Sequence, residues 1–165
     1  MTDIALIFDA AAWAADLALA DGDLVTDDGL MTAIAISLFT DARARDDDPL
    51  PAGADRRGWW GDAFNDRAED RTGSRLWLLD RGKLTPGIEI EARDIAREAL
   101  AWLIEDQVVS ALEVSAEVRR PSPAHPAGAL AIIVQVARPS GPARMRFDAV
   151  WDATTRAITI TRSIA

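Results

Sequence analysis

The last third of the chain repeats an alternation of apolar and polar side chains, and this period constrains the fold more than any other feature. Every second residue is apolar in 111–119 and 129–137, and a similar pattern returns in 144–151 and 157–164. A period of two matches a β-strand, whose successive side chains point to opposite faces. Turn residues such as proline and glycine separate several of these runs. The sequence therefore predicts an antiparallel meander of four strands.

Two helices are predicted before this sheet. Thr85-Pro86 combines an N-cap residue with proline at the first helical position, and the helix is expected to end near Asp106. Its apolar face is formed by Ile88, Ala92, Ile95, Ala96, Ala99, Trp102 and Leu103. An earlier helix is expected to start after the acidic N-cap Asp27-Asp28 and to end near Arg45. Its apolar face is formed by Leu30, Ile34 and Leu38.

The N-terminal segment predicts further strands. Asp3–Asp9 and Asp16–Leu19 alternate in polarity, and Asp21-Gly22 is typical of a hairpin turn. Trp13 is expected to be a buried core side chain. Because strands and helices occur in separate runs, the predicted class is α+β: an antiparallel C-terminal sheet packed by two or three helices, with an N-terminal β-hairpin.

The length of 165 residues suits one domain with a substantial core. We expect residues 1–165 to form this single domain. Within it, 1–45 would be the N-terminal hairpin and helix, 46–73 a loop with two adjacent tryptophans, and 74–165 the remaining helices and the antiparallel sheet.

The composition argues against several classes of site. The chain has no cysteine and one histidine, so zinc sites and catalytic triads are poor candidates, and neither a metal nor another cofactor is expected. Its net charge of -9 argues against nucleic acid or an anionic membrane as a partner. No apolar run approaches the ~20 residues that a membrane helix needs. Asp46-Asp47-Asp48 lacks the alternating ligands of a calcium loop and is interpreted as a solvated charge run.

Two adjacent indoles stand between two glycines in the stretch Asp55-Arg56-Arg57-Gly58-Trp59-Trp60-Gly61-Asp62. Two interpretations of Trp59 and Trp60 remain open. The indoles could fill a gap over the core, or they could anchor a partner, since tryptophan and arginine dominate interface hot spots. The segment Leu76–Leu79 is also compatible with two structures, a short helix capped by Ser74 or a buried strand.

Three segments of the chain are together similar to one protein family. They are Arg57-Gly58-Trp59-Trp60-Gly61-Asp62, Gly73-Ser74-Arg75-Leu76-Trp77-Leu78-Leu79, and Ala99-Leu100-Ala101-Trp102-Leu103 with Glu105-Asp106. On these residues the chain resembles the Mu-like prophage baseplate protein family. It is more distantly similar to the contractile-tail baseplate-wedge family, whose glutamate-proline-arginine motif is replaced here by Glu105-Asp106-Gln107. The resemblance favours a helix for Leu76–Leu79.

The resemblance implies a structural component of a contractile tail baseplate, and not an enzyme. Its partners would be other baseplate wedge, tail tube or sheath proteins, with the chain monomeric alone and present in several copies in the baseplate. We expect it in the host cytoplasm during assembly and then in the virion tail. The predicted interaction residues are Arg56, Arg57, Trp59, Trp60, Asp62, Glu105 and Asp106. A lysozyme-like peptidoglycan hydrolase of the tail and a bacterial adaptor domain of phage origin remain as alternatives.

Three surface properties are expected as well. At least one of the two adjacent indoles should be exposed. The strand over 157–164 should form a free sheet edge, suited to pairing with a strand of a partner chain. Residues 1–45 hold eight acidic and two basic side chains, whereas 119–165 hold seven arginines and two aspartates, which predicts an acidic and a basic end.

Overall fold

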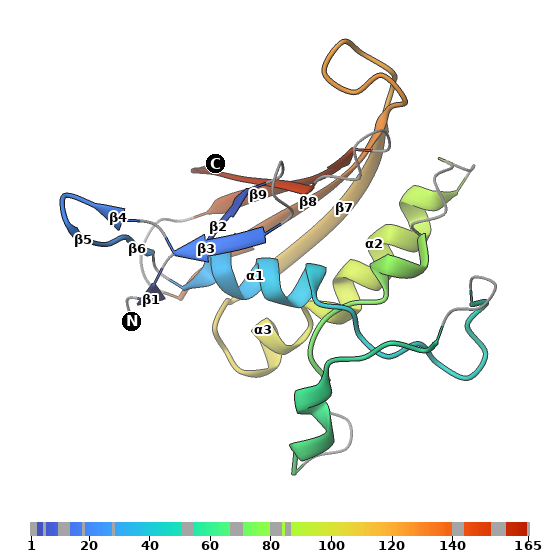
Figure 1. Cartoon of the computed structure of the whole chain (residues 1–165), viewed down its shortest axis with the longest axis horizontal. Helices are drawn as coiled ribbons and strands as arrows, with labels where there is room; N and C mark the ends of the chain where they lie inside the picture. The colour runs from blue at the N-terminus through green and yellow to red at the C-terminus, as the bar shows by residue number, and fades with distance from the viewer. Residues whose placement is uncertain are drawn as a thin grey trace.

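A four-stranded antiparallel sheet forms the largest layer of the computed structural model (Figure 1). Its strands are β7 (Ala111–Arg119), β8 (Ala129–Ala137), β9 (Met145–Asp152) and β10 (Ile158–Ile164), in the order β10-β9-β8-β7. The predicted meander is confirmed, and β7 and β8 have the predicted bounds.

The structure describes residues 3–4, 6–9, 14–17, 19–27, 29–50, 55–66, 71–79, 84, 87–139, 144–152 and 158–164.

Helices cover one face of this sheet, so the α+β class is confirmed (Figure 1). The α-helices are α1 (Leu30–Phe39), α2 (Ile88–Ala99) and the short α3 (Trp102–Glu105), and two 3-10 helices are η1 (Trp60–Phe64) and η2 (Leu76–Leu79). The main core lies between the helices and the sheet. Its largest fully buried side chains are Leu30, Ile34, Leu38, Leu100, Leu103, Val134, Val136 and Phe147.

The N-terminal segment forms three small antiparallel pairs. Strand β1 (Asp3–Ile4) pairs with β6 (Thr26–Asp27), β2 (Leu6–Asp9) with β3 (Ala14–Leu17), and β4 (Leu19–Ala20) with β5 (Asp23–Leu24). The hairpin predicted at Asp21-Gly22 is confirmed: both residues have positive φ, 53° and 84°, as a tight turn between antiparallel strands requires. Trp13, expected to be buried, lies outside the described residues.

The first helix begins after Asp27 and Asp28, as predicted, but its predicted end is wrong. Its N-cap is Gly29, with a left-handed φ of 77°, in place of the expected aspartate; Asp28 lies outside the described residues. The helix ends at Phe39 instead of near Arg45, because the next residues bond to a distant segment. Ser74 N donates to Thr40 O at 2.9 Å, and Ala42 N donates to Ser74 O at 2.9 Å. The predicted apolar face, however, is buried.

The second helix is shorter than predicted. It begins at Ile88 after Gly87, whose φ is 86°, while Thr85 and Pro86 lie outside the described residues. It ends at Ala99, where a tightened turn separates α2 from α3: Ala101 N donates to Glu98 O at 3.2 Å, an i to i−3 bond. Leu100, in this turn, and Leu103, in α3, are both fully buried in the core. On the surface of α2, Arg93 forms an ion pair with its neighbour Asp94 at 2.7 Å.

Two of the expected surface properties depend on the sheet. Strand β10 pairs only with β9 in the described sheet, so its predicted edge position is confirmed; pairing with a partner chain stays a prediction. The two-ended charge distribution also stays a prediction. Two of the C-terminal arginines bind acids of the same sheet: Arg119 lies 3.1 Å from Glu117, and Arg146 lies 2.9 Å from Asp148.

The packing of α1 against the sheet gives a direct stability prediction. Leu38 is 1% exposed, whereas Ile36 on the same helix is 43% exposed. Leu38→Ala should lower the free energy of unfolding by about 2–5 kcal/mol, because it removes a fully buried side chain and leaves a cavity. Ile36→Ala, the matched control, should lower it by less than about 1 kcal/mol. Urea titration measures both, and equal losses would contradict the described orientation of α1.

Candidate functional site

The segment that follows α1 is held on both sides by other parts of the chain. On one side it forms a parallel bridge between Asp41 and Ser74. On the other side, Ala44 N donates to Arg56 O at 2.9 Å. Ser74 is buried, and its Oγ donates to Leu38 O at 2.5 Å. The double-tryptophan stretch is therefore tied to the end of α1 and, through it, to the main core.

Two glycines make the close approaches in this region possible. Gly73 has a φ of 100°, and a Cβ placed on it would lie 2.2 Å from Thr40 O. Gly61 lies beneath the indole of Trp59, so that a Cβ there would meet ring carbons at 2.2 Å. Any side chain at either position would displace its neighbour, because real Cβ atoms do not approach other atoms this closely.

Arg57 fixes the double-tryptophan stretch to the segment after α1. Its Nη1 donates to Asp41 Oδ2 at 2.7 Å, and its guanidinium lies 4.4 Å from the ring centroid of Trp77, a cation–π contact. The Trp77 indole is buried, and its Nε1 donates to Ala42 O at 2.8 Å. Arg57 thus makes internal contacts with both its charge and its flat face.

The other charged residues of the stretch also make internal contacts. Arg56 donates to the backbone carbonyls of Arg45 and Asp46. Asp62 accepts a hydrogen bond from Thr72 N at 3.0 Å and so ties η1 to the segment before Gly73. Three of the predicted interaction residues, Arg56, Arg57 and Asp62, therefore hold the local backbone in place.

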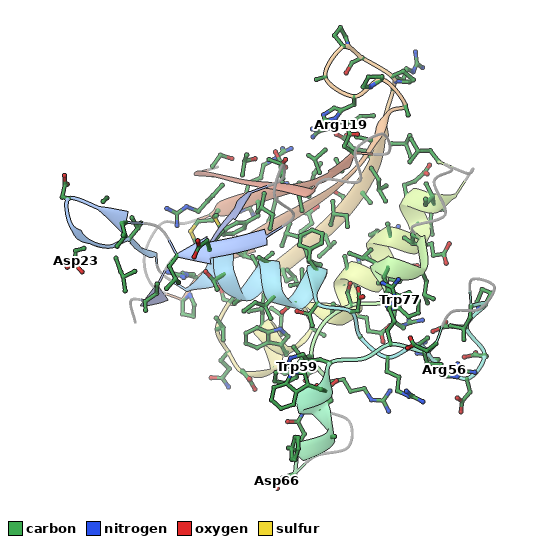
Figure 2. All side chains as sticks on the ribbon, viewed as in Figure 1. Asp23, Arg56, Trp59, Asp66, Trp77 and Arg119 are labelled. Carbon is green, nitrogen blue, oxygen red and sulfur yellow. The ribbon has the colours of Figure 1, made fainter. Side chains whose placement is uncertain are left out.

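The aromatic side chains of the stretch point outward. Trp59 is 41% exposed, Trp60 75% and Phe64 78%, and we call these three residues the aromatic knob. The ring centroids of Trp59 and Trp60 are 5.6 Å apart, and Phe64 meets Trp60 edge-on at 6.1 Å. The expectation of an exposed indole is confirmed, and Figure 2 shows Trp59 on the η1 segment, which projects away from the sheet.

Phe64 was missed by the sequence analysis. Its separation of four residues from Trp60 brings the two rings together only because η1 is helical, and no apolar periodicity marked that helix. Had the sequence predicted a helical turn from Trp60, Phe64 would have been expected close to the Trp60 ring.

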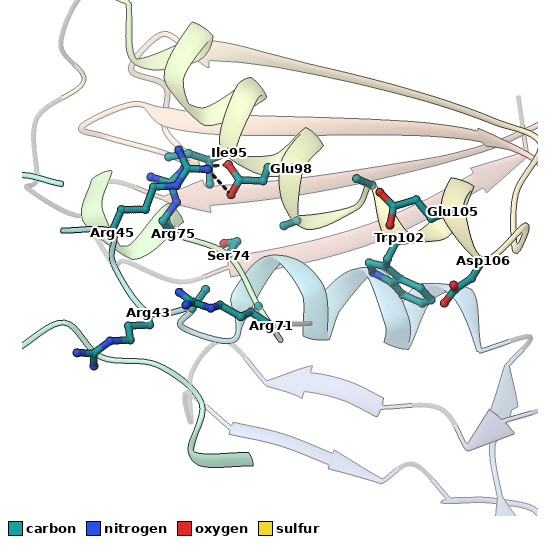
Figure 3. Close-up of a pocket in the computed structure, with 14 residues that line it drawn as sticks. Arg43, Arg45, Arg71, Ser74, Arg75, Ile95, Glu98, Trp102, Glu105 and Asp106 are labelled. Atoms are coloured by element: carbon teal, nitrogen blue, oxygen red, sulfur yellow. Dashed lines mark hydrogen bonds and ion pairs between the residues drawn. The ribbon is translucent and has the colours of Figure 1, made fainter. Parts of the chain in front are cut away.

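A cleft of about 660 Å³ opens where the segment after α1 meets α2 and α3 (Figure 3). Residues with small or no side chains leave room in it: Ala42, Gly73, Ser74, Ala99 and Ala101. Ile95, one indole and charged residues complete the lining: Trp102, Arg43, Arg45, Arg71, Arg75, Glu98, Glu105 and Asp106. Two predicted interaction residues, Glu105 and Asp106, are therefore placed on this cleft and are both exposed.

Arg75 organises the charges along one wall of the cleft. Its Nη1 lies 2.8 Å from Asp48 Oδ1, and its Nη2 lies 2.9 Å from Glu98 Oε2. Arg45 also binds Glu98, at 2.7 Å. Burial by itself lowers the pKa of Arg75, but the hydrogen bonds and charges of Glu98 and Asp48 outweigh it and raise that pKa above its ordinary value.

Asp48 corrects the interpretation of the three consecutive aspartates. Asp46 is solvated, as expected, but the side chain of Asp48 is only 14% exposed and binds Arg75. Sequence reasoning missed this pair because the two residues are separated by 27 positions. Among the described residues, no group of three acidic or histidine side chains could hold a metal ion.

His125 lies in the loop between β7 and β8 and contacts a buried aspartate. Its Nδ1 contacts Asp152 Oδ2 at the end of β9, and that aspartate is buried. The contact fastens the loop between β7 and β8 to the neighbouring strand β9.

The chain matches a known protein family over the residues that form this site. A family model described as phage protein GP46 matches residues 30–143, a range that includes the aromatic knob and the cleft. The chain belongs to the GP46 family. It is 52% identical over 118 residues to the baseplate protein gp46 of Escherichia phage Mu, covering 71% of this chain and 78% of that protein. It is 39% identical over 137 residues to the Mu-like prophage FluMu protein gp46 of Haemophilus influenzae, covering 82% and 89%.

No solved structure matches the fold of this GP46 family member. None of the helices in the described part of the chain has the length and apolar character needed to cross a membrane.

The ion pairs of Arg75 connect the loop that carries Asp48 to α2. Arg75→Gln should lower the free energy of unfolding by about 2–4 kcal/mol, because it leaves the largely buried Asp48 without its cation. Arg45→Gln removes the other partner of Glu98 from an exposed position and should cost less than about 1 kcal/mol. Chemical denaturation of both variants makes the comparison. If Arg45→Gln costs as much as Arg75→Gln, the assigned role of Arg75 is wrong.

Proposed function

We propose that this protein is a structural subunit of a contractile phage tail baseplate that acts in tail assembly by binding neighbouring proteins. The observation that carries the proposal is its 52% identity to a protein named as the baseplate protein of phage Mu, over 71% of the chain. The neighbours are other baseplate wedge, tail tube or sheath proteins. The subunit is monomeric alone and enters the baseplate in several copies, after synthesis in the host cytoplasm.

The aromatic knob is the contact surface that we assign to this function. Exposed tryptophan and phenylalanine side chains bury large apolar areas when a partner covers them, and tryptophan is enriched at interface hot spots. The knob stands on a base fixed by Arg56, Arg57 and Asp62. A rigid base lowers the conformational entropy lost on binding, so more of the contact energy stabilises the complex.

The geometry favours this role over a lysozyme-like hydrolase. Glycosidase chemistry needs two carboxyl groups in contrasting settings, one of them desolvated. Glu105 and Asp106 are both exposed at the cleft, and Glu98 is bound by two arginines. In a turbidity assay on purified cell walls, the protein should leave the absorbance unchanged. Clearance that depends on Glu105 or Asp106 would favour the hydrolase.

The location of the protein tests the proposed function itself. Purified tails of the encoding phage should contain the chain, and immunogold particles should decorate one end of each tail. Tails that lack the chain while retaining other baseplate proteins would contradict the proposal. Such a result, with neighbouring genes that encode no tail proteins, would favour the adaptor alternative.

The aromatic knob gives the corresponding mutational prediction. The double variant Trp60→Ala/Phe64→Ala should change the free energy of unfolding by less than about 1 kcal/mol, because both side chains are exposed. Its incorporation into tails should fall at least tenfold, the loss expected when hot-spot residues are removed.

Ile90→Ala is the matched control for this double variant, since Ile90 is a large apolar residue that is 56% exposed on α2. Quantitative mass spectrometry of purified tails gives the incorporation of each variant. If the double variant is incorporated normally, the aromatic knob is not a contact surface, but the proposed baseplate function still stands.

A further inference from the structure

The cleft beside the aromatic knob carries opposite charges along its length. Arg43 and Arg71 lie on one side, near the Arg45–Arg75–Glu98 network, whereas Glu105 and Asp106 flank Trp102 on the other (Figure 3). The separation arises because the arginines come from the segments around 43 and 71, and the acids come from the end of α3.

Arg43 and Arg71 differ from the other two arginines of the cleft in their pairing. Arg45 shares Glu98 with Arg75, and Arg75 also binds Asp48. Within the described part of the chain, neither Arg43 nor Arg71 makes an ion pair, and both side chains are exposed. Two guanidinium groups are thus available to an incoming ligand in a protein whose net charge is -9.

Guanidinium groups bind carboxylates with two parallel hydrogen bonds, so acidic side chains are suitable ligands for this side of the cleft. The opposite side decides which kind of acidic molecule fits. A nucleic acid or an anionic lipid surface would bring further phosphates toward Glu105 and Asp106, which repel them. A peptide segment can reverse its charge within a few residues, and its middle can lie over the space left by Ala42, Ala99 and Ala101.

We propose that Arg43 and Arg71 bind the acidic side chains of an extended segment from a neighbouring protein, whose basic side chains meet Glu105 and Asp106. The proposal rests on the proposed function, because it gives the chemistry of one baseplate partner. The aromatic knob and the cleft are neighbouring parts of one surface: Arg43 lies under Gly58, and Thr72, next to Arg71, binds Asp62. A partner that covers the knob can therefore place such a segment in the cleft.

The test uses a synthetic octapeptide, acetylated and amidated, with two glutamates at one end, two arginines at the other, and alanine and leucine between. Isothermal titration and ¹⁵N NMR with the full-length chain measure its affinity and its position. We expect saturable binding, with the largest shifts at the residues that line the cleft. Because the contacts are between exposed charges, the affinity should fall as salt is raised.

Two double variants with the same net charge locate the binding. Arg43→Gln/Arg71→Gln should weaken the octapeptide at least tenfold. Arg97→Gln/Arg120→Gln removes two exposed arginines that do not line the cleft and should change the affinity less than twofold. A peptide with both glutamates replaced by glutamine should bind the wild-type chain as weakly as the original peptide binds the first double variant.

Several results would overturn the proposal. These are no saturable binding of the octapeptide at millimolar concentration, equal weakening by the two double variants, and tighter binding of inorganic phosphate or a single-stranded oligonucleotide at Arg43 and Arg71. If light scattering shows a dimer of the wild-type chain and a monomer of the Arg43→Gln/Arg71→Gln variant, the cleft is occupied by a second copy of this chain. That result also contradicts the proposal. If the octapeptide does not bind but purified tails contain the chain, only the cleft proposal is rejected. If purified tails lack the chain, the proposed function is rejected whether or not the octapeptide binds.

Discussion

The hydrogen bonds of Ser74 join the end of α1, the segment that follows it and the start of η2. Its side-chain oxygen donates to Leu38 at the end of α1 and accepts from Leu76 N at the start of η2, while its backbone N and O bond to Thr40 and Ala42. A buried hydroxyl and a buried backbone are costly unless they are paired, and here all of these groups are. Ser74 therefore connects the end of α1 to the start of η2. It also fixes the segment after α1, which contacts the double-tryptophan stretch and lines the cleft.

This arrangement divides the double-tryptophan stretch into two kinds of residue. The charged residues face their own chain: Arg57 binds Asp41 and covers Trp77, and Asp62 binds Thr72. The aromatic residues face solvent, with Trp60 resting between Trp59 and Phe64. Three exposed aromatic rings in contact with one another form a contiguous apolar patch, and the proposed contact surface rests on this patch. The cleft adds charges of both signs next to it.

The sequence predicted the elements that follow from local periodicity, but not the features that depend on contacts between residues far apart in the chain. The patterns over 111–119 and 129–137 gave β7 and β8 with correct bounds: one face of β7 meets the core, and β8, inside the sheet, is buried along most of its length on both faces. The early end of α1 could not be predicted, since it requires Ser74 to lie beside Thr40. The same limit applies to the site: nothing local indicates that Arg75 meets Asp48 and Glu98, whereas the outward position of at least one indole was expected from the glycines around the pair.

Solvent accessibility of Trp60, in the isolated chain and in assembled tails, tests the central claim that the aromatic knob is a contact surface. Hydroxyl-radical footprinting with mass spectrometry measures oxidation of this indole in both states, and Phe64 and Ile90 can be followed in the same spectra. The account predicts rapid oxidation of Trp60 in the isolated chain, where it is 75% exposed, and at least tenfold slower oxidation in tails, with Ile90 changing little. Equal oxidation of Trp60 in the two states would contradict it.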